Sequence, residues 1–361
     1  MSRTLFVTRK FPPAVGGMET LAAETWRAIE TEPGSRLVAH GGANRSLWRW
    51  VPPAALAVRR AVHRDEVDCV LTGDTLTAAL FGPLLGQNRR PRLVSMAMGL
   101  DLTYDRWGYQ HLARRGLAGC DLVLAISRST AELAVGLGAA AARVEVIRLG
   151  VQAPKVTPAE RVEARHRLDD RTGGHTVGHR VLGTLGRLVQ RKGHRWFVTN
   201  VLPSLPDVHY VVAGDGAEAT TIRAAAEAVD VADRVHLLGP VDDADREAVL
   251  RGVDVFVQPN VRVADDVEGF GLVAIEAAMR GTPVVAARIE GLADAVDHTH
   301  TGLLVEPADA AAWVSTLDEL LSNGDALARL GLDWGARARA RYSPEQFAAA
   351  VRAAVGLGSG S

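Results

Sequence analysis

Short apolar runs alternate with longer, alanine-rich stretches along the chain, and the alternation occurs in both halves. Continuous apolar runs bounded by Gly, Pro, Asp or Arg are typical of buried parallel strands, and the stretches between them have a helical period. This order of elements predicts an α/β fold with parallel sheets and crossover helices. The predicted strands are residues 5–8, 36–40, 67–72, 92–98, 122–127 and 144–150, then 180–186, 209–216, 234–239, 253–259, 282–287 and 301–307.

The alternation breaks after Gly150, where a polar stretch contains Pro154, Pro158 and the pair Gly173-Gly174. We interpret this stretch as an interdomain linker with a short helix. A chain of 361 residues also exceeds the size at which one core usually stops growing. We therefore predict two doubly wound, Rossmann-like domains, residues 1–153 and 154–339. An amphipathic helix at about 340–357 is expected to return to the first domain.

Charge and hydropathy narrow the function classes. The formal net charge of -1 argues against a protein that binds nucleic acid by bulk electrostatics. No signal-peptide pattern and no apolar run of spanning length is found, which predicts a cytoplasmic protein with at most peripheral membrane contact. Cys69 and Cys120 lie in or beside apolar runs and are expected to be buried structural thiols, and His236 is expected to be a core residue.

A glycine pair follows the first predicted strand. Gly16 and Gly17 end the loop FPPAVGG, directly before an apolar-periodic helix. Glycine allows close backbone approach to a phosphate, and a helix N-terminus adds partial positive charge there. A tight turn without a ligand explains the pattern equally well.

Two cations follow the first strand of the second half. Arg187 and Lys192 lie in the loop after residues 180–186, beyond the carboxyl end of a predicted buried strand. Open α/β sheets bind ligands at that edge, and a guanidinium with an ammonium suits a departing diphosphate. The alternative is two solvated charges on a surface loop.

The segment EGFGLVAIE combines two carboxylates with a predicted helix start. Glu268 precedes Gly269, Phe270 and Gly271, the helix begins near Leu272, and Glu276 lies one turn inside it. Free amides at such a helix start hold an anion or a sugar hydroxyl. The carboxylates could be an acid and base for glycoside hydrolysis, acceptors for hydroxyl groups, or a helix-dipole and a surface carboxylate.

Taken together, FPPAVGG, GRLVQRKG, VVAGDG, VHLLGPV and EGFGLVAIE followed by GTPVVA resemble the retaining glycosyltransferases of family 4 over essentially the whole chain. The resemblance implies a GT-B fold, in which two Rossmann-like domains face a cleft. It implies a transferase that moves a hexose from a UDP or GDP donor to a lipid, glycan or small natural-product acceptor. The first domain would hold mainly the acceptor and the second mainly the donor.

The resemblance also assigns roles by position. Arg187 and Lys192 would clamp the diphosphate, and Gly16 and Gly17 would meet it from the opposite wall. Glu276 would bind the ribose, and Val241 would lie near the base. The sugar and its phosphate would be held by Glu268 and by the backbone of Gly269, Phe270, Gly271 and Leu272. Such enzymes need no metal ion and no cofactor besides the nucleotide sugar, and no Asp-x-Asp motif with the strand context of metal-dependent transferases is evident in this sequence.

One position departs from the family pattern. The family carries a histidine after the fourth strand, close to the donor sugar, and Met98 stands in its place. A thioether neither donates a hydrogen bond nor carries charge. We therefore expect an altered donor or acceptor pocket, with Asp101, Arg128 and His111 as candidates to supply the missing polar contact.

The stretch LWRWVPPAALAVRRAVHR combines aromatic and basic residues: Trp48, Arg49, Trp50, Arg59, Arg60 and Arg64. We interpret it as a loop leading to a helix with solvated arginines, and a surface for a lipid or anionic acceptor is the alternative.

Three functional alternatives to the transferase stay open from the sequence. A nucleotide-sugar epimerase would release an altered sugar without an acceptor, and a phosphorylase would use free phosphate. A nucleotide-sugar-binding protein without turnover is the third, and Met98 is the reason to consider it.

Overall fold

The computed structural model describes residues 3–14, 16–86, 90–103, 108–264 and 266–357. Contacts divide the chain into two compact units: one holds the described residues up to Gly150 and from Tyr342 onward, and the other is Val151–Arg341. The sequence had suggested boundaries at 153 and 340. Each unit contains a six-stranded parallel sheet, so the predicted α/β fold with two Rossmann-like sheets is confirmed.

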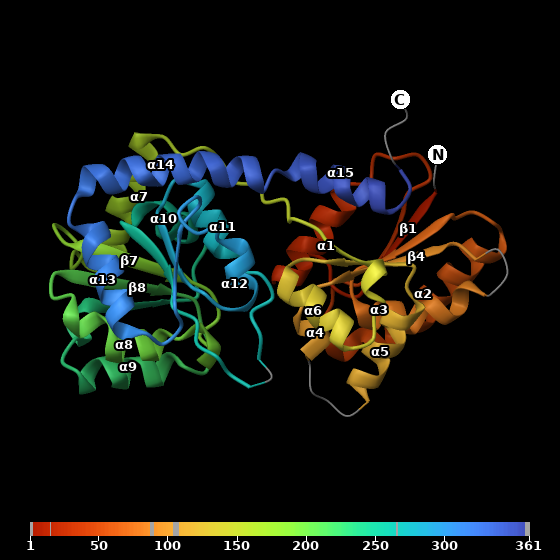
Figure 1. Cartoon of the computed structure of the whole chain (residues 1–361), viewed down its shortest axis with the longest axis horizontal. Helices are drawn as coiled ribbons and strands as arrows, with labels where there is room; N and C mark the ends of the chain where they lie inside the picture. Colours follow the sequence, from red (N-terminus) through yellow and green to blue (C-terminus); the bar gives the residue numbers. More distant parts are fainter. Residues whose placement is uncertain (1–2, 15, 87–89, 104–107, 265, 358–361) are drawn as a thin grey trace. The chain divides into compact units, whose positions relative to one another are not determined.

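In the first unit the strands run in the order β2-β1-β3-β4-β5-β6. Helices α1 and α15 lie on one side of this sheet, and α3 and α5 lie on the other (Figure 1). The strands are β1 Thr4–Thr8, β2 Arg36–Ala39, β3 Cys69–Thr72, β4 Arg92–Ala97, β5 Leu122–Ala125 and β6 Val144–Val146. The helices are α1 Gly17–Arg27, α2 Leu47–His63, α3 Thr75–Phe81, α4 Leu100–Thr103, α5 Tyr109–Gly119, α6 Arg128–Gly136 and α15 Pro344–Ala354.

In the second unit the order is β12-β11-β10-β7-β8-β9. Helices α7, α10, α11 and α14 cover one side, and α8 and α9 the other (Figure 1). The strands are β7 Arg180–Leu185, β8 Val208–Ala213, β9 Val235–Gly239, β10 Val255–Gln258, β11 Val284–Ala287 and β12 Leu303–Val305. The helices are α7 Pro158–Arg171, α8 His194–Asn200, α9 Ala219–Ala228, α10 Asp243–Gly252, α11 Leu272–Met279, α12 Glu290–Ala295, α13 Ala310–Leu321 and α14 Gly324–Arg341.

Burial follows the apolar runs of the sequence. Every residue of β1, β3, β8, β10 and β11 is buried, because helices cover both faces of the sheets. Cys69 and Cys120 are buried free thiols, as predicted, and burial raises the pKa of each to about 12. They therefore stay protonated and apolar at neutral pH.

Two segments are more helical than predicted. The short helix expected within the linker stretch is α7, which has 14 residues, opens with a capping box between Thr157 and Glu160 and packs against α10. The Trp-Arg stretch, interpreted as a loop before a helix, is helical from Leu47 to His63 with Pro52 and Pro53 inside. Within the described residues, no helix combines the length and the hydropathy that a bilayer crossing requires.

Candidate donor site at the carboxyl edge of the second sheet

Strands β7 and β10 are neighbours in the second sheet, and the chain order reverses between them. The crevice beyond the carboxyl ends of two such strands is the usual ligand site of an open α/β sheet. The loop after β7 carries Arg187 and Lys192, and the loop after β10 carries Glu268. The topology therefore brings these three predicted residues to one edge.

Lys192 and Glu268 form a buried ion pair there. The Lys192 Nζ lies 2.6 Å from Glu268 Oε2, and the side chains are 9% and 11% exposed. Lys192 also donates to Gln258 Oε1, and Asn260 Nδ2 donates to Glu268 Oε2. Burial would raise the pKa of Glu268, but the charges of Lys192 and Arg191 lower it to about 2. Glu268 is therefore a carboxylate throughout the neutral range.

The pair keeps unused capacity for a ligand. Glu268 Oε1 makes no hydrogen bond or ion pair within the described part of the chain, and Lys192 makes two of the three contacts that an ammonium can donate. One acceptor and one donor are thus held beside each other, partly withdrawn from water. This combination suits a ligand with a hydroxyl group next to a phosphate.

Arg191 was missed in the sequence. Its guanidinium is 9% exposed, with Nη1 2.8 Å from Asp266 and Nε 3.5 Å from Glu268. It therefore ties the two carboxylates of the loop after β10 to the short 3-10 helix Gln190–Lys192. A basic pair after a strand is its only signal in the sequence, because both carboxylates lie far along the chain.

Arg187 is placed differently from Lys192. It is exposed, and its side chain makes no hydrogen bond or ion pair within the described residues. The backbone of its loop is fixed, since Gly186 donates to Ala213 O and Leu188 donates to Asp215 O. A rigid loop thus presents an unpaired cation at the carboxyl edge.

Helix α11 begins beside this cluster without a side-chain cap. Its N-cap Gly271 has φ 73°, and a Cβ there would lie 2.3 Å from Leu292 Cδ2, so glycine is required on both conformational and steric grounds. Leu272 is the first helical residue, and Phe270 is buried just before it. The first amides of α11 are therefore available to an anion.

The second predicted carboxylate, Glu276, lies one turn inside α11. Its Oε2 forms an ion pair with Arg246 Nη2 of α10. Arg246 lies in the helix that follows Val241, a half-buried residue just after β9. Glu276 and Arg246 are therefore paired across α11 and α10, and the arginine was not predicted from the sequence.

In the first unit, Gly16 is the N-cap of α1 and Gly17 is its first residue. The Glu19 carboxylate folds over Gly16, where a Cβ would lie 2.4 Å from Glu19 Oε2. Lys10 Nζ holds the same carboxylate at 3.2 Å from Oε1. An acidic side chain of the protein thus occupies the neighbourhood of this glycine turn.

The residues proposed to replace the family histidine differ in burial. Met98 and Asp101 are buried after β4, where Asp101 accepts from the amides of Met98 at 2.8 Å and Thr75 at 3.0 Å. Burial, with the charge of Asp74 nearby, raises the pKa of Asp101 to about 6. Both Asp101 oxygens are therefore engaged by the protein. Arg128 begins α6 and is exposed, as is His111 on α5.

Comparison with known proteins decides the family. Residues 179–323 match the family model described as "Glycosyl transferases group 1", and residues 15–153 match "Glycosyltransferase Family 4". The two matches together span most of both units. This chain belongs to glycosyltransferase family 4.

Relatives with named activities align over most of this glycosyltransferase. The GDP-mannose-dependent alpha-(1-6)-phosphatidylinositol monomannoside mannosyltransferase of Mycolicibacterium smegmatis is 28% identical over 358 residues, 91% of each chain. The D-inositol 3-phosphate glycosyltransferase of Mycobacterium sp. (strain KMS) is 34% identical over 275 residues, 74% of this chain and 57% of that protein. The chain is thus a nucleotide-sugar-dependent glycosyltransferase.

Solved structures establish the fold of the glycosyltransferase as GT-B. Anabaena HepE, solved in complex with UDP, superposes with a TM-score of 0.80 at 19% identity, covering 98% of this chain and 100% of that one. Sucrose-phosphate synthase from Thermosynechococcus elongatus superposes with a TM-score of 0.78 at 19% identity, covering 98% of each.

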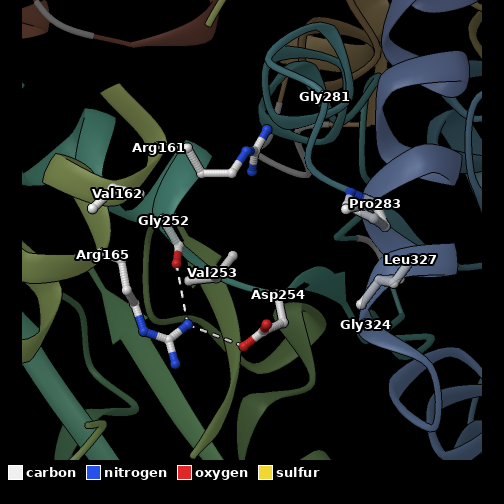
Figure 2. Close-up of a pocket in the computed structure, with 11 residues that line it drawn as sticks. Arg161, Val162, Arg165, Gly252, Val253, Asp254, Gly281, Pro283, Gly324 and Leu327 are labelled. Atoms are coloured by element: carbon white, nitrogen blue, oxygen red, sulfur yellow. Dashed lines mark hydrogen bonds and ion pairs between the residues drawn. The ribbon is translucent and has the colours of Figure 1, made fainter. Parts of the chain in front are cut away.

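A cavity of about 220 Å³ lies away from the donor-site residues of the glycosyltransferase, at the amino ends of β10 and β11 (Figure 2). Its charged groups are engaged in the fold: Arg165 contacts Gly252 O and Asp254, and Arg161 donates to Arg251 O and Arg280 O. Nor, among the residues described, are three His, Cys, Asp or Glu side chains grouped to hold a metal ion.

Proposed function

We propose that this glycosyltransferase moves mannose from GDP-mannose to an inositol-bearing lipid, with retention of the anomeric configuration and without a metal ion. Similarity to GDP-mannose-dependent mannosyltransferases supports GDP-mannose as the donor, since the matches cover 91% and 95% of this chain. Both activities named among the relatives use an inositol-containing acceptor. The phosphatidylinositol-based acceptor is favoured because those matches extend over the whole length.

The observation that carries the proposal is the Lys192–Glu268 pair beside the uncapped start of α11. In this assignment Lys192, Arg187 and the first amides of α11 bind the diphosphate. Glu268 Oε1 accepts a hydroxyl of the transferred sugar. Glu276 binds the ribose after Arg246 yields part of its ion pair, and the backbone of residues 269–272 borders the sugar phosphate.

The chemical step needs charge stabilisation more than a protein nucleophile. The bond from the sugar anomeric carbon to the phosphate oxygen breaks, and the bond to the acceptor oxygen forms on the same face. The acceptor hydroxyl proton passes to the departing phosphate oxygen, so GDP leaves with its charge balanced. Preorganised cations and helix amides stabilise that growing charge in the place where other transferases use a metal ion.

Transfer of radiolabelled mannose tests the proposal. With purified protein in EDTA, we expect GDP-mannose to label phosphatidylinositol or its monomannoside, with an α-linked product by NMR. Thermal shifts with GDP-, UDP- and dTDP-sugars should be largest for GDP-mannose, since a ligand that binds the folded state raises the Tm. Preference for a UDP-sugar would reject GDP-mannose as the donor. Loss of activity in EDTA would reject a metal-independent reaction.

The same preparation separates the alternative activities. Slow release of GDP from the donor without acceptor is expected of a transferase. Conversion of the intact nucleotide sugar to another sugar indicates an epimerase, and dependence on free phosphate indicates a phosphorylase. Tight donor binding with neither release nor transfer indicates a binding protein without turnover.

A further inference from the structure

Helix α2 has an exposed face that combines aromatic, aliphatic and basic side chains. Trp48 is 73% exposed and Leu56 is 48% exposed, both among the most exposed large hydrophobic residues. Arg49, Arg59 and Arg60 are also exposed. Trp48 and Arg49 precede Leu56 by eight and seven residues, about two helical turns, and Arg59 and Arg60 follow it by three and four. Such spacings place side chains on one side of a helix, so these five form one stripe.

The opposite face of α2 packs on the first unit. Trp50 contacts Phe81 edge-to-face at a centroid distance of 5.6 Å, and Ala54 and Val58 are buried. The two tryptophans of the stretch therefore differ: Trp50 belongs to the packing, and Trp48 does not. The sequence alone could not make this distinction.

The charge of this surface is one-sided. Between Glu32 and Asp65 the sequence contains six arginines and no acidic residue, although the whole chain has a net charge of -1. Arg36 pairs with Glu66, and Arg64 approaches the same carboxylate. Within the described residues no acidic side chain pairs with the other four, Arg45, Arg49, Arg59 and Arg60. Many other arginines of the chain are paired, so this surface lacks its counter-charge.

An exposed indole and leucine lose the stabilisation that burial would give them. At a bilayer surface the same groups enter the region between head groups and acyl chains, and flanking arginines contact anionic head groups. Tryptophan is also enriched at that depth. The combination on α2 therefore fits a membrane surface better than it fits water.

We propose that the exposed face of α2 docks the protein on a bilayer that contains anionic lipid, with the helix lying in the plane of the interface. The docking residues are Arg45, Trp48, Arg49, Leu56, Arg59 and Arg60. The inference deepens the proposed function, because it gives a transferase with a lipid acceptor a means to reach it. The biological role of the docking surface rests on the proposed function, whereas its binding to lipid does not.

Co-sedimentation of the full chain with vesicles tests the surface. We expect binding to phosphatidylcholine vesicles that contain phosphatidylglycerol, weak binding to pure phosphatidylcholine, and weakening by salt. Each basic residue contributes about fivefold to such binding, so R59E/R60E should reduce the partition coefficient by at least about 25-fold. Trp48→Ala should reduce it severalfold at any salt concentration.

R114E/R115E is the matched control. Arg114 and Arg115 are adjacent exposed arginines on α5 of the same unit, and the variant changes the net charge by the same amount. It should bind like wild type. Equal losses in both double variants, or no preference of the wild type for anionic vesicles, would overturn the proposal. So would binding of the α2 surface to heparin in preference to vesicles, which would indicate a soluble polyanion as partner.

A second measurement separates this proposal from the proposed function. GDP release from GDP-mannose without acceptor should be the same in R59E/R60E and wild type, and Tm should be unchanged. Vesicle binding that is intact in a protein without mannose transfer would reject the function and leave the docking surface standing. Normal mannose transfer by a protein that does not bind vesicles would reject the docking surface and leave the proposed function standing.

Discussion

Lys192 and Arg187 are both cations at the carboxyl edge of the second sheet, but their surroundings differ. Lys192 is buried against Glu268, whereas Arg187 is exposed and unpaired within the described residues. We expect Lys192→Ala to lower kcat/KM by about 100- to 1,000-fold, as loss of one preorganised donor does. It should also destabilise the fold by ~2–4 kcal/mol, because Glu268 loses a buried partner. Kinetics and urea unfolding measure the two effects.

Arg187→Ala supplies the matched comparison for Lys192→Ala. It should weaken donor use by about tenfold or more through a lost phosphate contact, and leave the urea midpoint unchanged because no intramolecular contact is removed. A loss of stability equal to that of Lys192→Ala would contradict this view of the loop.

Met98 allows a test of the altered pocket. If the pocket is shaped for a contact without a hydrogen bond, Met98→His should lower turnover with the natural donor, because an imidazole adds a polar group at a site that is 4% exposed. Met98→Leu, of similar volume and polarity, should stay close to wild type. Unchanged or improved turnover in Met98→His would disprove the hypothesis.

At the residue scale, the sequence predicted groups that follow strands but not the partners that hold them. Arg187, Lys192 and Glu268 could be predicted because each follows a strand of a recognisable pattern. Arg191 and Arg246 could not, since their carboxylate partners lie 77 and 30 positions away and are fixed only by the order of strands. Whether two charged residues meet as an ion pair depends on the order of strands in the sheet, and a single sequence does not show that order directly.

At the element scale, the strands were predictable because helices bury them on both faces, which makes them continuous apolar runs. The helices whose exposed faces mix polar and apolar residues were harder to predict. Pro52 and Pro53 suggested a loop, yet α2 continues through both, since packing of Trp50 and Val58 outweighs the proline cost. The polar linker stretch was expected to contain only a short helix, and α7 extends over 14 residues because Ala164 and Leu168 bury a narrow stripe against α10.

Helix α7 also carries an arginine that joins two other helices. Arg161 donates to Arg251 O of α10 and to Arg280 O just after α11. A cation at two C-termini satisfies unpaired carbonyls and complements both dipoles. We expect Arg161→Met to lower the free energy of unfolding by about 2–3 kcal/mol, since the carbonyls lose their donor. Urea unfolding measures this, and KM for the donor should not change.

Val162 provides the control for this prediction. It lines the same cavity from the next position of α7 and is 56% exposed, so Val162→Met adds volume there without removing a hydrogen bond. Its stability should stay within about 0.5 kcal/mol of wild type. If both variants were equally destabilised, the cavity rather than the helix termini would explain the effect.

At the scale of the whole molecule, the two units differ in how acid affects them. In the second unit, His209 Nδ1 lies 2.9 Å from His236 Nε2. His175 stacks on His236, His179 lies tilted against His209, and Asp233 and Arg234 are close enough to act on these rings electrostatically. His236 therefore belongs to a histidine cluster on edge strand β9, half-buried rather than in the core as predicted. Burial and the neighbouring histidines lower its pKa to about 4, and burial lowers that of His194 to about 3.

These shifts have opposite consequences in the two units. Where the folded pKa of a histidine is lowered, the unfolded chain binds more protons than the folded one between about pH 6.5 and the folded pKa. The free energy of unfolding therefore decreases as the pH is lowered through that window. The pKa of Asp101 is raised to about 6, so below that pH the folded first unit binds more protons than its unfolded chain does. Protonation of Asp101 therefore increases the free energy of unfolding of the first unit as the pH is lowered. Acid should weaken the second unit and spare the first.

Calorimetry at pH 7 and pH 5 tests this asymmetry. A buried neutral histidine such as His194 costs about 2 kcal/mol at pH 5, which corresponds to ~4–8 °C in a unit of this size. We expect the transition of the second unit to move down by at least that amount and that of the first to move little. The variant H209Q/H236Q should show a smaller decrease in the Tm of the second unit, and the decrease that remains should be the contribution of His194. Equal shifts of both transitions would show that net charge, rather than these buried groups, controls acid stability.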